Sequence, residues 1–109
     1  NLSTTLGYKC RAWVNFNGTG TVVIRASGNV SSITDNGAGD YNVNFTTAMV
    51  DANYTIAGGA GVTGGLADPQ PLSWKDNSAL PTTGSVRIMV KTRGHSATDQ
   101  ARVAVVVFR

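Results

Sequence analysis

Apolar and polar residues alternate with a period of two through most of the chain, which is the pattern of half-buried β-strands. The alternation is clearest in the segment 41–49, where one side carries Tyr41, Val43, Phe45, Thr47 and Met49. The preceding segment 35–40 reads DNGAGD. It suits a chain reversal, because Gly tolerates positive φ and Asp accepts local backbone hydrogen bonds. The pattern therefore predicts a central hairpin with arms at 30–34 and 41–49.

Two further strands are predicted ahead of this hairpin, at 8–17 and 21–27. In the first, the alternation turns Cys10, Ala12, Val14 and Phe16 toward the core and leaves Trp13 on the opposite side. In the second, it turns Val22, Ile24 and Ala26 inward. We expect these strands and the hairpin to follow one another in antiparallel order as far as Met49.

The second half of the chain is less regular. Strands are predicted at 53–57, 85–93 and 102–108, whereas 58–84 is too rich in Gly and Pro for regular structure outside 72–75. Long loops in small domains tend to be functional. The last strand, RVAVVVF, has apolar residues on both faces, so we expect a central strand or one whose outer face a neighbouring subunit covers.

About seven or eight short strands without crossover helices predict an all-β fold. The expected architecture is one antiparallel β-sandwich over residues 1–109, jelly-roll-like or Ig-like. A compact barrel would give nearly the same pattern. The chain begins without an initiator Met and has no apolar run long enough to cross a bilayer, so we expect a soluble domain cut from a longer chain.

Composition narrows the chemistry. A single cysteine excludes an internal disulfide, and we expect Cys10 to be a buried free thiol. The formal charge is +3, but the cations are scattered rather than gathered in a basic run with stacking aromatics, so nucleic acid is not an expected partner.

One strand concentrates positive charge, because Arg87, Lys91 and Arg93 fall on the same side of 85–93. One interpretation is a solvated face that prevents edge-to-edge strand pairing. The other is attraction to an anionic surface polymer such as lipopolysaccharide.

The sequence offers little support for catalysis. Glycoside hydrolysis needs two carboxyl groups about 5–10 Å apart, and the only acids here are Asp residues in turns and loops. His95, Ser96 and Asp99 contain triad residue types but lack the structural context of a triad. The segment 35–40 fails the spacing of a calcium loop. We therefore expect no enzyme activity, no metal site and no cofactor.

Recognition is the chemistry that remains. Trp74 is an aromatic residue followed by Lys75, Asp76 and Asn77, the combination that a sugar needs for stacking and directional hydrogen bonds. Alternatively, Trp74 closes the end of the sandwich or lies in a subunit interface. The apolar outer positions Trp13, Val106 and Phe108 predict an oligomer interface, which we expect to be that of a homotrimer.

Three segments also carry a family resemblance: CRAWVNFNGTGTV at 10–22, SITDNGAGDYNVNFTTAM at 32–49 and DANY at 51–54. From about Tyr8 to Ile56 the chain resembles a module of the tail-fibre proteins of tailed bacteriophages. In such proteins the module lies at or near the carboxyl end of the fibre, where trimeric tips touch the host surface. The resemblance implies an extracellular virion component that binds a bacterial surface glycan or outer-membrane component and contacts other tail proteins.

The expected function is thus attachment of a phage tail-fibre tip to its host, with Trp74, Lys75, Asp76, Asn77, Arg87, Lys91 and Arg93 as candidate receptor-binding residues. The alternative is a structural virion domain, either a capsid decoration domain or a fibre-shaft connector. A small glycan hydrolase is a third and weaker hypothesis.

Overall fold

The computed structural model describes residues 9–61, 72–75, 79–91 and 96–109, and regular structure in these ranges is entirely β. The strands are β1 (Cys10–Asn17), β2 (Val23–Gly28), β3 (Val30–Gly37), β4 (Asp40–Phe45), β5 (Thr55–Gly61), β6 (Leu72–Trp74), β7 (Ser85–Val90) and β8 (Arg102–Phe108). Within the described ranges no helix is long and apolar enough to cross a membrane.

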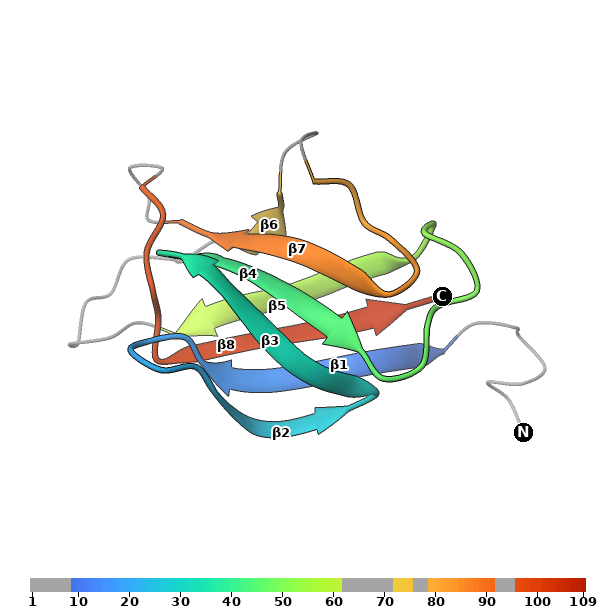
Figure 1. Cartoon of the computed structure of the whole chain (residues 1–109), viewed down its shortest axis with the longest axis horizontal. Helices are drawn as coiled ribbons and strands as arrows, with labels where there is room; N and C mark the ends of the chain where they lie inside the picture. Colours follow the sequence, from blue (N-terminus) through green and yellow to red (C-terminus); the bar gives the residue numbers. More distant parts are fainter. Residues whose placement is uncertain (1–8, 62–71, 76–78, 92–95) are drawn as a thin grey trace.

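The strands form two four-stranded antiparallel sheets that face each other (Figure 1). Sheet A has the order β2-β1-β8-β5, and sheet B has the order β3-β4-β7-β6. The buried apolar side chains of both sheets form one core between them. The predicted antiparallel β-sandwich of about seven or eight strands is confirmed.

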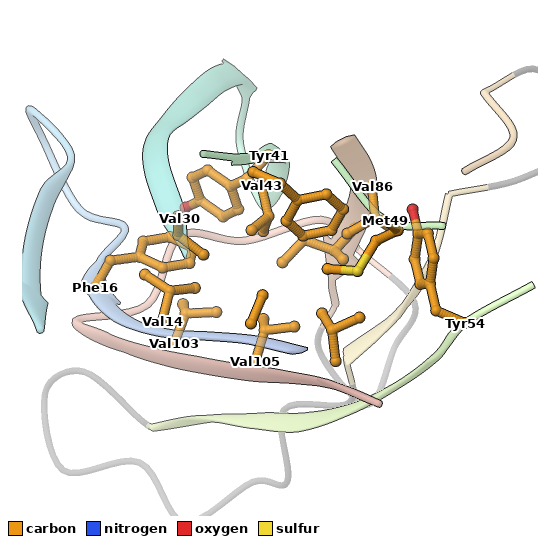
Figure 2. Close-up of a cluster of buried hydrophobic side chains, with 14 of the residues drawn as sticks. Val14, Phe16, Val30, Tyr41, Val43, Met49, Tyr54, Val86, Val103 and Val105 are labelled. Carbon is orange, nitrogen blue, oxygen red and sulfur yellow. The ribbon is translucent and has the colours of Figure 1, made fainter. Parts of the chain in front are cut away.

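The core is filled from both ends by aromatic rings (Figure 2). At one end, Phe16 of sheet A meets Tyr41 of sheet B edge to face, with ring centroids 5.1 Å apart. Toward the other end, Phe45 and Tyr54 make a second edge-to-face contact at 5.7 Å. Small β-branched side chains fill the space between, which matches the high strand propensity of Val.

The sequence predicted that the first four strands follow one another in antiparallel order, and this prediction was wrong. They form two antiparallel pairs in different sheets, because the chain crosses from sheet A to sheet B between β2 and β3. Asn29 makes this corner with a φ of 56°. Its amide nitrogen donates to the carbonyl oxygens of Arg11 and Thr47, and its amide oxygen accepts the Thr47 N–H. One side chain therefore joins β1 of sheet A to the segment that follows β4 of sheet B.

Two bulges overturn predictions that assumed unbroken alternation. The register of β1 against β8 shifts between Cys10 and Ala12, and Cys10 is an exposed thiol rather than a buried one. The register of β1 against β2 shifts between Asn15 and Phe16, so Ala26 lies opposite Asn15 and is exposed instead of buried. A bulge inserts one residue into a strand and thereby reverses the facing of the residues beyond it.

The central hairpin differs from the prediction at its ends. Tyr41, Val43 and Phe45 are buried as expected, but β4 stops at Phe45 and Thr47 is exposed. Met49 is buried but belongs to no strand. Its N–H donates to the carbonyl oxygen of Thr83 at 2.8 Å, which satisfies the backbone there.

The hairpin turn has the predicted chemistry. Gly37 and Gly39 both hold positive φ, at 132° and 63°. Asp35 accepts the Gly37 N–H at 3.0 Å, which is the local side-chain bond expected of a turn aspartate.

The strand orders bear on two predictions about the later strands. β8 lies inside sheet A between β1 and β5, as its apolar sequence predicted. β7 lies inside sheet B between β4 and β6, so its cations do not protect an open sheet edge. β5 continues to Gly61, four residues beyond the predicted end at Ala57, and the short strand predicted within 72–75 is present as β6.

Candidate binding and assembly surfaces

The outer face of sheet A is apolar across its middle. Trp13 lies between Gly28 of β2 and Val106 of β8, and Ala57 of β5 follows Val106 in the same row. The next row along the strands consists of Ala26, Asn15, Ala104 and Gly59. On β1 and β8, charge is confined to the two ends of the face, where Arg11 and Arg102 stand.

Large apolar groups on this face are open to solvent. Trp13 is 44% exposed and Phe108 is 42% exposed, while Val106 is half-buried. A shallow hollow of about 260 Å³ lies beside Trp13, Ala104 and Val106. Exposed contiguous apolar surface on a small domain marks a site of association.

The indole of Trp13 lies over Gly28 of the neighbouring strand β2. A Cβ atom at Gly28 would collide with the indole ring, so the absence of a side chain at Gly28 lets the ring settle there. The backbone of β2 at Gly28 thus covers part of the Trp13 ring, and the rest of the ring remains exposed.

Asn15 adds a polar feature to this face. Its side-chain oxygen is buried and has no hydrogen-bond partner. A buried acceptor without a partner costs free energy on the order of 1–3 kcal/mol.

The outer face of sheet B is polar and internally hydrogen-bonded. Asn44 donates from its amide to the hydroxyls of Ser32 and Thr34, at 3.1 and 2.9 Å. Asn36 donates to the amide oxygen of Asn42 at 2.7 Å. These cross-strand bonds between β3 and β4 hold amide and hydroxyl groups in a flat array.

One member of the predicted row of cations, Arg87, is paired with a carboxylate. Arg87 makes two hydrogen bonds to Asp40, each 2.8 Å long, and the Lys75 ammonium lies 3.9 Å from the same carboxylate. The Arg87 hydrogen bonds lower the pKa of Asp40, against the opposing effect of burial. Lys91 is half-buried, and Arg93 lies outside the described residues. Of the two described members of the row, Arg87 is thus held by Asp40 and Lys91 is partly covered.

Trp74 lies on β6, the edge strand of sheet B. The chain segments before and after this short strand, 62–71 and 76–78, lie outside the described residues. Trp74 pairs with Ile88, a core residue, and its ring centroid is 6.2 Å from that of Tyr54. It remains 40% exposed. The Lys75 N–H donates to the carbonyl oxygen of Arg87, which continues the pairing of β6 by one residue. Asp76 and Asn77 lie outside the described residues.

The described carboxylates all have structural partners. Asp35, Asp40, Asp51 and Asp99 each accept hydrogen bonds from backbone N–H groups or side chains. Within the described ranges no group of three or more His, Cys, Asp or Glu residues is placed to hold a metal ion. His95 lies outside these ranges, as do Asp68 and Asp76.

Two of these partnerships were not predicted from the sequence. Asp99 accepts the N–H of Gly39 at 2.8 Å and lies 2.7 Å from the Tyr41 hydroxyl, which ties the last loop to the central hairpin. Asp51 makes a paired contact with Arg109, with nitrogen–oxygen distances of 3.0 and 2.7 Å. Each pair joins residues 58 positions apart or more, a separation at which local patterns carry no signal.

Comparison of the chain with protein-family models, with curated proteins and with solved structures found no match in any of the three.

Proposed function

We propose that this domain is the tip module of a phage tail fibre, that it assembles as a homotrimer and that it attaches the virion to a glycan or lipopolysaccharide on the bacterial surface. The observation that carries the proposal is the difference between the two outer faces of the sandwich. The outer face of sheet A is apolar with exposed Trp13 and Phe108, whereas that of sheet B is lined by amides and hydroxyls.

The two faces suit different partners. On β1 and β8 this apolar face carries charge only at its ends, which resembles the centre of a protein interface, where charged residues are depleted. Packing this face against copies of the chain would bury Trp13, Val106 and Phe108 around a common axis. The polar face would then point outward, toward the host.

Receptor contact is assigned to the side of the domain that carries Trp74 and Lys75. The exposed part of the Trp74 ring offers an aromatic surface for a sugar, and Lys75 and Arg87 lie next to it along the sheet. In this role the domain binds without breaking bonds, and it needs neither a metal ion nor a cofactor.

A second candidate is a structural virion domain, as a capsid decoration or a fibre-shaft connector. One observation favours it, because the Trp74 ring packs beside Tyr54 on the core-facing side of β6. A ring in that position stabilises the edge of the sandwich whether or not it binds a receptor.

Adsorption of intact fibres to host cells separates the two candidates. The variant Trp74→Ala removes the ring, and Leu72→Ala is the matched control, since Leu72 also packs on the core from β6. We expect Trp74→Ala fibres to assemble as trimers but fail to adsorb, while Leu72→Ala fibres still adsorb. Equal adsorption by both variants, or loss of assembly with Trp74→Ala, would assign Trp74 to packing and favour the structural domain.

A further inference from the structure

A second recess lies at the end of the sandwich where β1 begins and β8 ends, away from Trp74. Its volume is about 710 Å³, which falls within the range of about 300–1,000 Å³ typical of small-molecule sites. One wall is formed by Lys9, Cys10, Arg11 and Arg109, and the other by the segment 47–50.

The recess carries more positive than negative charge. Arg109 is neutralised by Asp51, whose pKa the Arg109 hydrogen bonds lower to about 2, so the Asp51 carboxylate remains ionised. Arg11 uses only its Nε, which donates to a main-chain oxygen of Arg109 at 2.9 Å. Among the described residues, the structure gives the two terminal nitrogens of Arg11 and the Lys9 ammonium no hydrogen-bond partner, so the side chains at the recess supply three cations and one carboxylate, that of Asp51.

The geometry of Arg11 is suited to an oxyanion. The bond from its Nε holds the guanidinium in place. In a planar guanidinium one terminal N–H runs parallel to the Nε–H and the other three point away from it, so these three can meet a ligand. A planar guanidinium binds carboxylate or phosphate oxygens in pairs, and an adjacent ammonium adds a point charge.

The opposite wall is apolar. Met49 is buried at the recess, and Val50 at its rim is 80% exposed. A ligand with one charged group and one apolar face would therefore match both walls. A sugar ring that carries an acidic substituent has this composition.

We propose that this recess binds an acidic saccharide unit, with its carboxylate or phosphate at Lys9 and Arg11 and its ring against Met49 and Val50. The choice of a saccharide rests on the proposed attachment function. The inference deepens that function, because it names an acidic group as the feature that the domain recognises, at a site separate from Trp74.

Cys10 provides a direct probe, since it lines the recess, is exposed and is the only cysteine of the chain. We would measure the alkylation rate of Cys10 by anionic iodoacetate and by neutral iodoacetamide at low ionic strength. Lys9→Gln and Arg11→Gln should each lower the ratio of the two rates about twofold, because each removes one nearby positive charge. Arg25→Gln is the matched control. Arg25 is an exposed cation on β2, beside Asn15 and Phe16 of β1 and therefore about five residues along the sheet from Cys10, so its removal should leave the ratio unchanged.

Ligand protection then tests the saccharide. Glucuronic acid and glucose 6-phosphate should each slow iodoacetamide alkylation of Cys10, and glucose should not. Protection should disappear in Lys9→Gln and Arg11→Gln and persist in Arg25→Gln. Equal protection by glucose, equal protection by inorganic phosphate, or a rate ratio that none of the variants changes would overturn the proposal.

These measurements are made on the domain itself, so they separate the two proposals. If Cys10 is protected by acidic sugars while Trp74→Ala fibres still adsorb, the recess is a binding site and the assignment of Trp74 fails. If adsorption requires Trp74 but no acidic sugar protects Cys10, the attachment function stands and the recess is not its site.

Discussion

At the scale of single residues, Gly39 is constrained both by its own backbone and by its surroundings. Its φ is 63°, in the region that side chains disfavour. A Cβ atom there would also collide with the backbone of Val90 and Thr98. Its carbonyl oxygen accepts the Val90 N–H and its own N–H donates to Asp99, so the turn is locked to two other segments.

A comparison of substitutions at Gly37 and Gly39 therefore separates the cost of backbone strain from the cost of a steric collision. Gly37 also has positive φ, but a Cβ atom there would meet nothing within 4 Å. We expect Gly37→Val to lower the free energy of unfolding by about 1–3 kcal/mol through backbone strain alone. Gly39→Val should cost clearly more, as measured by urea denaturation. Equal midpoints for the two variants would show that the packing around Gly39 does not matter.

The pairing of Arg87 with Asp40 predicts a pH dependence. Because the pKa of Asp40 is lowered in the folded state, its contribution to stability is present above its ordinary pKa of 3.8 and is lost as pH falls through the lowered value. Arg87→Gln should therefore reduce stability near neutral pH and have a smaller effect at strongly acidic pH. The check is urea unfolding of both proteins across this range, and a stability difference that stays constant with pH would argue against the pairing.

Residue-scale features were only partly predictable from the sequence. The turn chemistry of 35–40 was predicted because it depends on adjacent residues. The burial of Cys10 was predicted wrongly, because a bulge between Cys10 and Ala12 changes which side of the strand the thiol occupies. The bonds of Asp99 to the hairpin could not be predicted, since they depend on how two distant loops meet.

At the scale of elements, the outer row of sheet A depends on a glycine in β2. Gly28 provides the space in which the Trp13 indole lies over the sheet. The same row continues through Val106 to Ala57, so a displaced indole would no longer lie flush with its neighbours.

Gly28→Ala should lift the Trp13 ring into solvent. In a Trp74→Phe background, where Trp13 is the only tryptophan, we expect a red shift of the fluorescence emission and greater quenching by acrylamide. Gly59→Ala is the control on the same sheet, because a Cβ atom at Gly59 would have no neighbour within 4 Å. If Gly28→Ala and Gly59→Ala give the same spectrum, the placement of the indole over Gly28 is wrong.

The strand pattern was the most predictable property of this protein. Period-two alternation located most of the strands. The apolar run of β8 predicted either a central strand or a covered outer face, and β8 does lie between two strands of sheet A. The alternation did not reveal the division of the first four strands between two sheets. That division depends on the corner at Asn29, whose side-chain bonds reach residues 18 positions away in either direction.

At the scale of the whole molecule, the sandwich has one apolar and one polar outer face. The core between the sheets is complete, with edge-to-face aromatic pairs toward both ends, so the exposed Trp13 and Phe108 are not needed to fill it. We propose that the outer face of sheet A is covered in the assembled protein, because exposed apolar side chains of this size mark surfaces of association. We assign the covering role to further copies of the chain.

Light scattering of the purified domain over a range of concentrations tests this assignment most directly. The account predicts a mass of three chains for the wild type. It predicts a folded monomer for Val106→Asp, which places a charge in the middle of the outer face of sheet A, and an unchanged trimer for the control Arg25→Gln. A wild-type domain that stays monomeric at high concentration, or a Val106→Asp variant that still forms trimers, would contradict it.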